Sequence, residues 1–247
     1  MKKKKLITRR NAIITGVSTI GGLLLTGCSR KLPPTYGNIL RMGDVLTYTA
    51  QRTLLPGQSL AREYQLSDIS SFPATGTTNP GAPGQPGYSE TYGKLHSGAF
   101  SDWRLSLEGR VARPKKYSLA ELQQFPARTQ VTRHTCEEGW TAIGQWTGVP
   151  LGLLLQNAGI LPSARFVNFY AYDDYMESID LYDAFHPQTI LAYGMNGSDL
   201  PIAHGAPLRL RVETQVGYKS VKYLQRIVVT DDFVNIGDTG WSWYVGI

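Results

Sequence analysis

The sequence predicts an α+β fold that is mainly β and forms a single domain. Most segments after residue 100 alternate apolar and polar residues, as half-buried strands do, and the helical segments between them are short. Strands and helices do not alternate regularly, which argues against a doubly wound parallel sheet. The chain contains no phosphate-binding Walker loop, no GxGxxG after a strand, no HExxH and no GxSxG motif.

The predicted elements follow one another from residue 103. Residues 103–109 alternate apolar and polar side chains and end at a glycine, which predicts a strand. Ser118 begins a short helix as its N-cap, because Glu121 stands at the capping-box position three residues later. A second helix is predicted over residues 149–159, with proline near its start and glycine at its end. Further strands are predicted over residues 129–135, 165–172, 175–181, 208–213 and 223–230, and a short helix over 182–185.

The N-terminus, residues 1–27, has the pattern of an export signal. Lysines and the pair Arg9-Arg10 precede an apolar run of about 14 residues, too short to span a bilayer. The paired arginines resemble a twin-arginine signal, which exports proteins already folded. The sequence Leu25-Thr26-Gly27-Cys28 resembles a bacterial lipobox and predicts lipidation of Cys28, which would anchor the chain to a membrane in the periplasm or cell envelope. The alternative for Cys28 is an unmodified thiol in an ordinary signal peptide.

Removal of this signal changes the charge of the chain. All charged residues before Cys28 are basic, and their loss reduces the formal net charge of +6 to near zero. A nucleic-acid partner, which needs a basic face, is therefore not indicated. A lipidated Cys28 could not pair with Cys136, so no disulfide is expected. We assign residues 28–66 to a tether and N-terminal extension, 67–233 to the functional domain and 234–247 to a C-terminal tail, with enough length for one core.

Cys136 is the only cysteine after Cys28, and it lies between a predicted strand and a glycine-containing loop. On a strand, His134 shares the face of Cys136 while Arg133 points away, so the histidine is the expected neighbour. The residues alone leave a buried hydrophobic thiol, a reactive nucleophile or a metal ligand open. A cysteine hydrolase would need His134, His186 or His204 as its base. The paired ligand spacing of a zinc site is absent from the sequence.

Two further segments bear on function. Residues 70–87 contain proline and glycine too often for a helix or strand, and composition alone indicates a linker. Residues 200–223 combine a glycine-containing turn with Arg209, Lys219 and Lys222. Backbone N–H groups and fixed cations of this kind suit an anionic, phosphorylated ligand, and the alternative is a solvated basic hairpin.

The chain carries five motifs in order, namely Cys136-Glu137-Glu138-Gly139-Trp140, Trp146–Leu151, His186–Tyr193, His204–Arg209 and Gly217–Lys222. Together they resemble the molybdopterin-binding domain of the sulfite-oxidase superfamily, over roughly residues 72–232. The form Cys-x-Glu-x-Trp is similar to the bacterial periplasmic branch, which includes the catalytic subunit of the protein-methionine-sulfoxide reductase.

This resemblance implies a mixed, mainly β fold that holds one molybdopterin with one molybdenum atom. Cys136 matches the catalytic position whose thiolate binds the metal. The implied activity is oxygen-atom transfer, or related two-electron chemistry, on a small substrate. Because the sequence has no haem motif, a cytochrome or other redox partner would exchange the electrons. The matched cofactor-binding positions are Thr75, His204, Arg209, Ser220, Val221 and Lys222.

The resemblance also changes the interpretation of residues 75–79 from a linker to an ordered loop around the pterin. Asp173, Asp174 or Tyr175 is then expected near the entrance of the site. The chain departs from its relatives at Ala171 and His204, where methionine-sulfoxide reductases carry threonine and asparagine, and in the less polar Ala74-Thr75 pair. The substrate is therefore open. A non-enzymatic lipoprotein that keeps the fold as a binding module, and a cysteine hydrolase using Cys136, are the alternatives.

Overall fold

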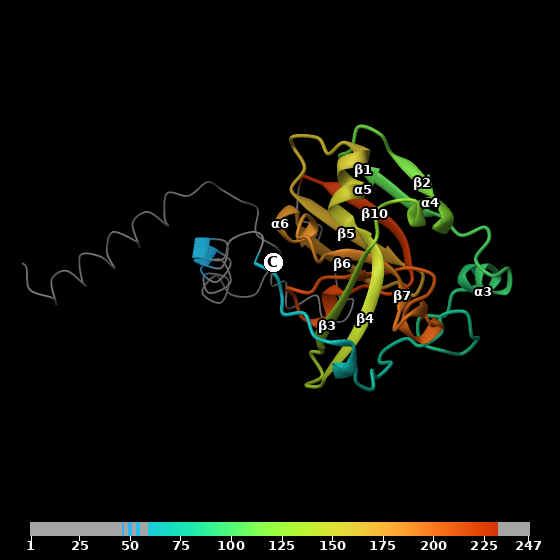
Figure 1. The fold of residues 1–247 in the computed structure, drawn as a ribbon. Coiled ribbons are helices and arrows are strands. Elements are labelled where there is room, and N and C mark those ends of the chain that lie inside the picture. The colour runs from blue at the N-terminus through green and yellow to red at the C-terminus, as the bar shows by residue number, and fades with distance from the viewer. Residues whose placement is uncertain (1–45, 47–48, 51–52, 55–58, 232–247) are drawn as a thin grey trace, which may run out of the picture. The chain divides into compact units, whose positions relative to one another are not determined.

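The computed structural model describes residues 46, 49–50, 53–54 and 59–231. The predicted export signal, Cys28 and the predicted C-terminal tail lie outside these residues. None of the helices within the described part combines the length and apolar character needed to cross a bilayer. The predicted α+β, mainly β fold is confirmed, because the described chain is built on two five-stranded sheets with short helices around them (Figure 1).

The first sheet brings together strands from distant parts of the chain, as its green, yellow and red members show (Figure 1). Its first and last strands in the sequence, β1 and β10, pair in parallel, while its other pairs are antiparallel. The strand order is β2 (Lys115–Tyr117), β1 (Leu105–Gly109), β10 (Leu224–Thr230), β5 (Phe166–Ala171) and β6 (Met176–Asp180).

The second sheet is antiparallel throughout. Its two long strands, β3 and β4, pair along their whole shared length and are connected by the turn that contains Cys136. The members are β3 (Arg128–Thr135), β4 (Thr141–Pro150), β7 (Ile190–Met195), β8 (Ser198–Asp199) and β9 (Arg209–Arg211).

The main core is formed by apolar side chains from both sheets and from the helices beside them. Trp103 is fully buried, and its indole N–H donates to the carbonyl of Leu224 at 3.1 Å, which satisfies its polar group. Within residues 59–231, the helices are α3 (Glu90–Ser97), α4 (Leu119–Gln123), α5 (Leu151–Ala158) and α6 (Leu181–Ala184), with single 3₁₀ turns η1 (Leu66–Asp68), η2 (Ile202–His204) and η3 (Gly217–Lys219).

Local signals located most of the predicted elements. The capping box between Ser118 and Glu121 is present at the start of α4. Helix α5 begins after Pro150 and ends at Gly159, which adopts the left-handed conformation at φ 72°. The predicted strands at 103–109, 129–135, 165–172, 175–181, 208–213 and 223–230 all contain observed strands, and α6 corresponds to the helix predicted at 182–185.

Strands β2, β4, β7 and β8 and helix α3 were not predicted. Glycines had indicated a loop after Cys136, but Gly148 lies inside β4 for a packing reason. A Cβ atom on Gly148 would stand 2.2 Å from the carbonyl oxygen of Leu191, so glycine allows β7 to approach at a register shift. The glycine therefore marks close backbone contact and does not end the strand.

Residues 59–64 lie along the outer edge of β3. Glu63 pairs with Thr132, and the N–H of Tyr64 donates to Val131 at 2.9 Å. The buried side-chain amide of Gln188 accepts from the N–H of Ala61 at 2.7 Å and donates to its carbonyl at 3.0 Å. This segment therefore covers backbone groups that an exposed edge strand would leave unpaired.

Candidate functional site

Cys136 follows β3 directly and is buried, with 6% of its surface exposed. Its N–H donates to the carbonyl of Trp140 at 2.9 Å, and Gly139 permits the turn with a φ of 92°. Along the end of the strand, His134 and Cys136 are buried while Arg133 and Thr135 are exposed. The predicted shared face of His134 and Cys136 is confirmed.

The environment of Cys136 keeps its sulfur in the thiol form. Burial raises the pKa of Cys136, the N–H of Glu138 opposes this rise, and the carboxylates of Glu137 and Glu138 add to it. The Sγ atom lies 3.6 Å from Oε2 of Glu137. A thiol of this kind is a poor nucleophile, whereas a bound metal ion deprotonates a coordinating thiol outright.

His134 does not act as a base for this thiol. Its Nδ1 atom lies 2.7 Å from Nη1 of Arg211, and a guanidinium can only donate. Burial lowers the pKa of His134 to about 2, and the charges of Arg211 and Arg209 contribute. Among the hydrogen bonds of the described residues, none joins Cys136 to a histidine. The base that a cysteine hydrolase requires is thus missing from the described site.

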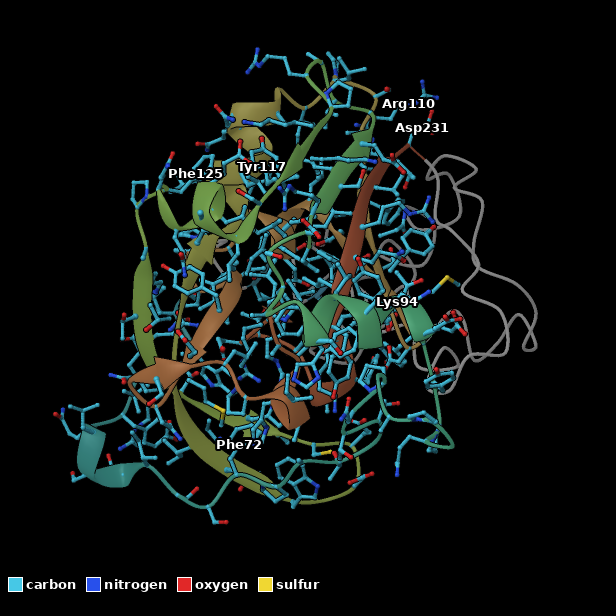
Figure 2. The ribbon with its side chains drawn as sticks, turned by 90° about the vertical axis from the view of Figure 1, so that its right-hand side faces the viewer. Phe72, Lys94, Arg110, Tyr117, Phe125 and Asp231 are labelled. Atoms are coloured by element: carbon cyan, nitrogen blue, oxygen red, sulfur yellow. The ribbon has the colours of Figure 1, made fainter. Side chains whose placement is uncertain are left out.

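Phe72, labelled in Figure 2, connects the Cys136 turn to η2, although no local pattern predicted this role. Its ring centroid lies 5.2 Å from that of His134 and 5.8 Å from that of Trp140. It also lies 5.3 Å from the Trp146 ring and 5.6 Å from the His204 ring. Residues that are distant in sequence therefore meet around one aromatic side chain.

Lys222 holds the segment around residue 75 against η2. Its Nζ atom donates to the carbonyl of Thr75 at 2.9 Å, to that of Thr77, and to that of Ala203 at 3.3 Å. Burial lowers the pKa of Lys222 to about 8, with a further contribution from Arg209. The composition-based linker interpretation is wrong for this segment, because an ordered loop packs on the domain.

Arg209 is buried in β9, with 4% of its surface exposed. It donates to the carbonyl of His204 at 2.9 Å and to that of Ser220 at 3.0 Å. Burial lowers its pKa to about 9, and the neighbouring Arg211 charge adds to this effect. Its guanidinium lies 5.0 Å from the Trp146 ring centroid, and within the described chain its Nε atom and Nε1 of Trp146 have no hydrogen-bond partner.

The segment from Gly217 to Lys222 packs directly against the Cys136 turn. A Cβ atom on Gly217 would lie 2.6 Å from Nε2 of His134 and 3.1 Å from Oε2 of Glu137. Ser220 and Val221 are buried, and the N–H of Leu210 donates to the carbonyl of Val221 at 2.8 Å. A solvated hairpin is therefore excluded for this segment.

The predicted cofactor-binding positions converge in the structure. Hydrogen bonds connect Lys222 with Thr75 and Arg209 with His204 and Ser220, while Phe72 and Gly217 connect this group to the Cys136 turn. Sequence reasoning did not identify the side chains that support the group. These are Phe72, Glu137, Glu177, Arg211 and Glu213.

The three residues expected near an entrance have different surroundings. The hydroxyl of Tyr175 donates to the carbonyl of Tyr218 at 2.9 Å, so it supports η3. Burial raises the pKa of Asp173, while the N–H of Tyr175 and the side chain of Thr77 act in the opposite direction. Asp174 has a positive φ of 63°, in the turn between β5 and β6. Their role at an entrance stays a prediction.

The residues fit an anionic cofactor bound through a thiolate. Cys136 offers a soft sulfur ligand, and the buried Nε–H of Arg209 is a donor that the described protein leaves unsatisfied. Lys222 adds a second cation near it. Among the described residues, no three His, Cys, Asp or Glu side chains gather as a metal-binding group. Cavities lined by α3 and by the ends of β1 and β10 lie elsewhere.

Comparisons with known proteins agree on one family. The model of the oxidoreductase molybdopterin binding domain matches residues 93–235. A protein of Azospira oryzae named "Putative protein-methionine-sulfoxide reductase subunit YedZ1" is 35% identical over 243 residues, which are 96% of this chain and 87% of that protein. The protein-methionine-sulfoxide reductase catalytic subunit MsrP of Ralstonia nicotianae is 33% identical over 145 residues, covering 52% of this chain and 44% of that protein.

Solved structures give the same result. The sulfane dehydrogenase SoxCD from Paracoccus pantotrophus aligns with a TM-score of 0.52 and 25% identity, over 54% of this chain and 39% of that one. The family match covers more than half of the chain and includes Cys136, His204, Arg209 and the segment from Gly217 to Lys222. The chain therefore belongs to the oxidoreductase molybdopterin-binding domain family and is a molybdenum-cofactor oxidoreductase.

Proposed function

We propose that this oxidoreductase is the catalytic subunit of an enzyme that reduces sulfoxides, with methionine sulfoxide as its substrate class. The observation that carries this proposal is the position of Cys136. It is the one cysteine among the described residues, is buried at the β3–β4 turn, and lies where this turn packs against the basic segment from Gly217 to Lys222. The names of two relatives supply the substrate class. Reduction of a sulfoxide consumes two electrons and two protons and yields a sulfide and water.

Each residue of the site has an assigned part in this proposal. Cys136 would bind the molybdenum, and a bound cofactor would supply a metal that accepts the oxygen atom and passes the electrons. Arg209 and Lys222 would balance the negative charge of the pterin, because the buried Arg209 and the half-buried Lys222 lie close to one another. The remaining cofactor contacts are assigned to Thr75, His204, Ser220 and Val221.

The electrons would come from a separate protein. The sequence contains only two cysteines and no haem-attachment motif, and the relative from Azospira oryzae is named as a subunit. We assign this partner to the class of membrane-bound or periplasmic cytochromes. Export in the folded state and a lipid on Cys28 would hold the enzyme at a membrane of the cell envelope, next to such a partner.

The test is a reductase assay on protein exported by a host that makes molybdopterin. Reduced benzyl viologen supplies the electrons, and free methionine sulfoxide and an oxidised protein are compared as substrates. We expect sulfoxide-dependent oxidation of the dye, which is lost in Cys136→Ser and in protein from tungstate-grown cells. A molybdenum-loaded enzyme that reduces neither substrate contradicts the proposal. Protein without molybdenum or pterin, from that host, would favour a binding module.

A further inference from the structure

The β1–β2 turn and the α5–β5 loop form one surface at the end of the first sheet. The N–H of Ala112 in the turn donates to the carbonyl of Gly159 in the loop at 2.7 Å. The N–H of Leu161 in the loop donates to the carbonyl of Arg110 in the turn at 3.0 Å. Main-chain hydrogen bonds therefore hold the two segments side by side. We call them together the basic loop surface, which consists of residues 109–116 and 157–165.

Every charged side chain of the basic loop surface is a cation, although the chain after Cys28 is close to neutral. All of these cations are exposed. Arg110 pairs with Asp231, and Lys115 pairs with Glu121 at 2.9 Å. Among the described residues, no carboxylate lies within salt-bridge distance of the remaining cations. These unpaired cations are Arg113, Lys116 and Arg165.

Two of the unpaired cations are held at the surface by hydrogen bonds to the main chain. Nε of Arg113 donates to the carbonyl of Asn157 at 3.0 Å, and Nη1 of Arg165 donates to that of Ala164 at 2.7 Å. Each guanidinium has five N–H donors, so further donors are left for a phosphate group. Leu161 adds an apolar side chain with 36% of its surface exposed. Cations beside an exposed apolar side chain suit the boundary between lipid headgroups and acyl chains.

The basic loop surface lies at the opposite end of the first sheet from the candidate cofactor site. Lys222 of that site precedes β10 and Asp231 follows it, and the seven residues of this strand span roughly 20 Å. Figure 2 shows Arg110 at one end of the domain and Phe72, which contacts the Cys136 turn, at the other. An electron donor has to approach the metal, so the basic loop surface is not its docking site.

We propose that the basic loop surface binds anionic phospholipid headgroups of a membrane. Each Lys or Arg close to an anionic membrane adds to the attraction, and the unpaired cations match the lipid phosphates in charge and in hydrogen bonding. This contact orients the domain with the β1–β2 turn towards the lipid and the Cys136 turn towards the aqueous phase. The inference goes beyond the proposed function, because it concerns the orientation of the domain and does not depend on the reaction.

Vesicle sedimentation with the exported full chain tests the proposal. Vesicles of phosphatidylcholine are compared with vesicles of equal parts phosphatidylcholine and phosphatidylglycerol. Any lipid on Cys28 attaches the chain to both kinds of vesicle, so the ratio of the two partition coefficients reports the charge-dependent contact. We expect the wild type to prefer the anionic vesicles by roughly ten- to a hundred-fold, and high salt to remove this preference by screening the charges.

A surface variant and a matched control locate the contact. The surface variant combines Arg113→Gln, Lys116→Gln and Arg165→Gln. The control removes the same charge from exposed positions elsewhere, with Arg62→Gln, Lys94→Gln and Arg104→Gln. We expect the preference for anionic vesicles to be lost in the surface variant and kept in the control. Equal preference in both variants overturns the proposal, because the total charge alone would then decide binding.

A single substitution covers the case in which the surface variant does not fold, as judged by circular dichroism. The side chain of Lys116 has no hydrogen bond to the described residues, so Lys116→Gln leaves the loop contacts intact. We expect this substitution to lower the preference for anionic vesicles by roughly five-fold. A folded Lys116→Gln protein with the wild-type preference overturns the contact at this surface.

A polarity-sensitive dye reports the orientation of the domain on the membrane. The dye is attached to Leu161→Cys or, as the control, to Leu66→Cys in η1, where the native side chain is 63% exposed. Wild-type chain treated with the dye gives the background from its own cysteines. We expect a blue shift with anionic vesicles for the dye at residue 161 and none at residue 66. The reverse result overturns the orientation.

The remaining outcomes separate a lipid surface from a protein partner and from the reaction. Equal partitioning of the wild type into both kinds of vesicle overturns the proposal. If the surface variant is then also reduced more slowly by a cytochrome, the cations serve an acidic protein instead. None of the vesicle measurements requires turnover, so an enzyme that fails to reduce sulfoxides contradicts the proposed function and leaves this inference unaffected.

Discussion

Gly217 and His134 touch at the point where the basic segment meets the Cys136 turn. A Cβ atom on Gly217 would lie 2.6 Å from Nε2 of His134, which is closer than two such atoms can approach. The backbone of Gly217 is not in the left-handed region, so its missing side chain serves packing only. The segment that carries Ser220 and Lys222 can therefore close on the thiol only with glycine at this position.

Gly217→Ala should lower the free energy of unfolding by about 1–3 kcal/mol, because the added methyl group overpacks this contact. In a chain that also carries His134→Ala, Gly217→Ala should lower the free energy of unfolding much less, because the ring that would clash with the methyl group is absent. Chemical denaturation of the four proteins of this double-mutant cycle measures the difference. Gly98→Ala is the control, because its Cβ would meet no atom closer than 3.6 Å. Equal costs in both backgrounds would contradict the assigned contact.

The buried pair of Lys219 and Glu177 gives a second prediction. Their side chains are each 1% exposed and 3.2 Å apart, and Lys219 also donates to the carbonyl of Ser178 at 2.8 Å. Lys219→Met leaves Glu177 buried without its partner, and we expect a loss of about 3–5 kcal/mol of stability. Urea denaturation at neutral pH measures it.

Lys94→Met is the matched control for this change. Lys94 pairs with Glu90 at 2.7 Å on the outside of α3, where both side chains are more than two-thirds exposed (Figure 2). An exposed pair of this type contributes little to stability, because water screens the two charges. A loss of similar size in both variants would show that the Lys219 charge pair is not buried in solution.

His204 should make stability depend on pH. Burial lowers its pKa from 6.5 to about 4, and the charges of Arg209 and Lys222 contribute. The unfolded state then binds more protons than the native state, so the stability from His204 is complete above pH 6.5 and is lost as pH falls towards 4. In His204→Asn this component is absent. We expect the difference in free energy of unfolding between wild type and His204→Asn, both without cofactor, to shrink as the pH falls from 6.5 to 4. Parallel pH profiles of the two proteins would contradict the lowered pKa of His204.

Gln188 should hold residues 59–64 on the edge of β3. Gln188→Leu removes both hydrogen bonds to the backbone of Ala61 and the one to Glu63. The segment should then detach more often, and trypsin should cleave after the exposed Arg62 faster than in the wild type. Gln123→Leu, at an exposed position in α4, is the control. Unchanged cleavage in Gln188→Leu would show that the segment is held by other contacts.

The sequence predicted those parts of the site that depend on local geometry. The alternation of a strand was enough to place His134 and Cys136 on one face, and a capping box was enough to start α4. The contact of Lys222 with Thr75 followed only from the resemblance, because contacts across more than a hundred residues leave no local pattern in the sequence.

Other features could not be predicted because they depend on tertiary contacts. The sequence predicted a glycine-containing loop after Cys136, whereas Gly148 lies inside β4 because the backbone of Leu191 approaches it closely. Phe72 has no distinguishing context in the sequence, and its importance comes from four rings that meet around it. Arg211 resembled an ordinary strand residue, although its neighbours Glu213 and His134 make it part of the site.

The most direct test compares molybdenum content and the Mo(V) spectrum of wild type and Cys136→Ser, both exported by a host that makes the cofactor. We expect one molybdenum per wild-type chain. In the variant we expect lower metal content or a changed Mo(V) spectrum, because a hard oxygen replaces a soft sulfur. Full molybdenum occupancy with an unchanged Mo(V) spectrum in Cys136→Ser would contradict the assignment of Cys136 as the metal ligand.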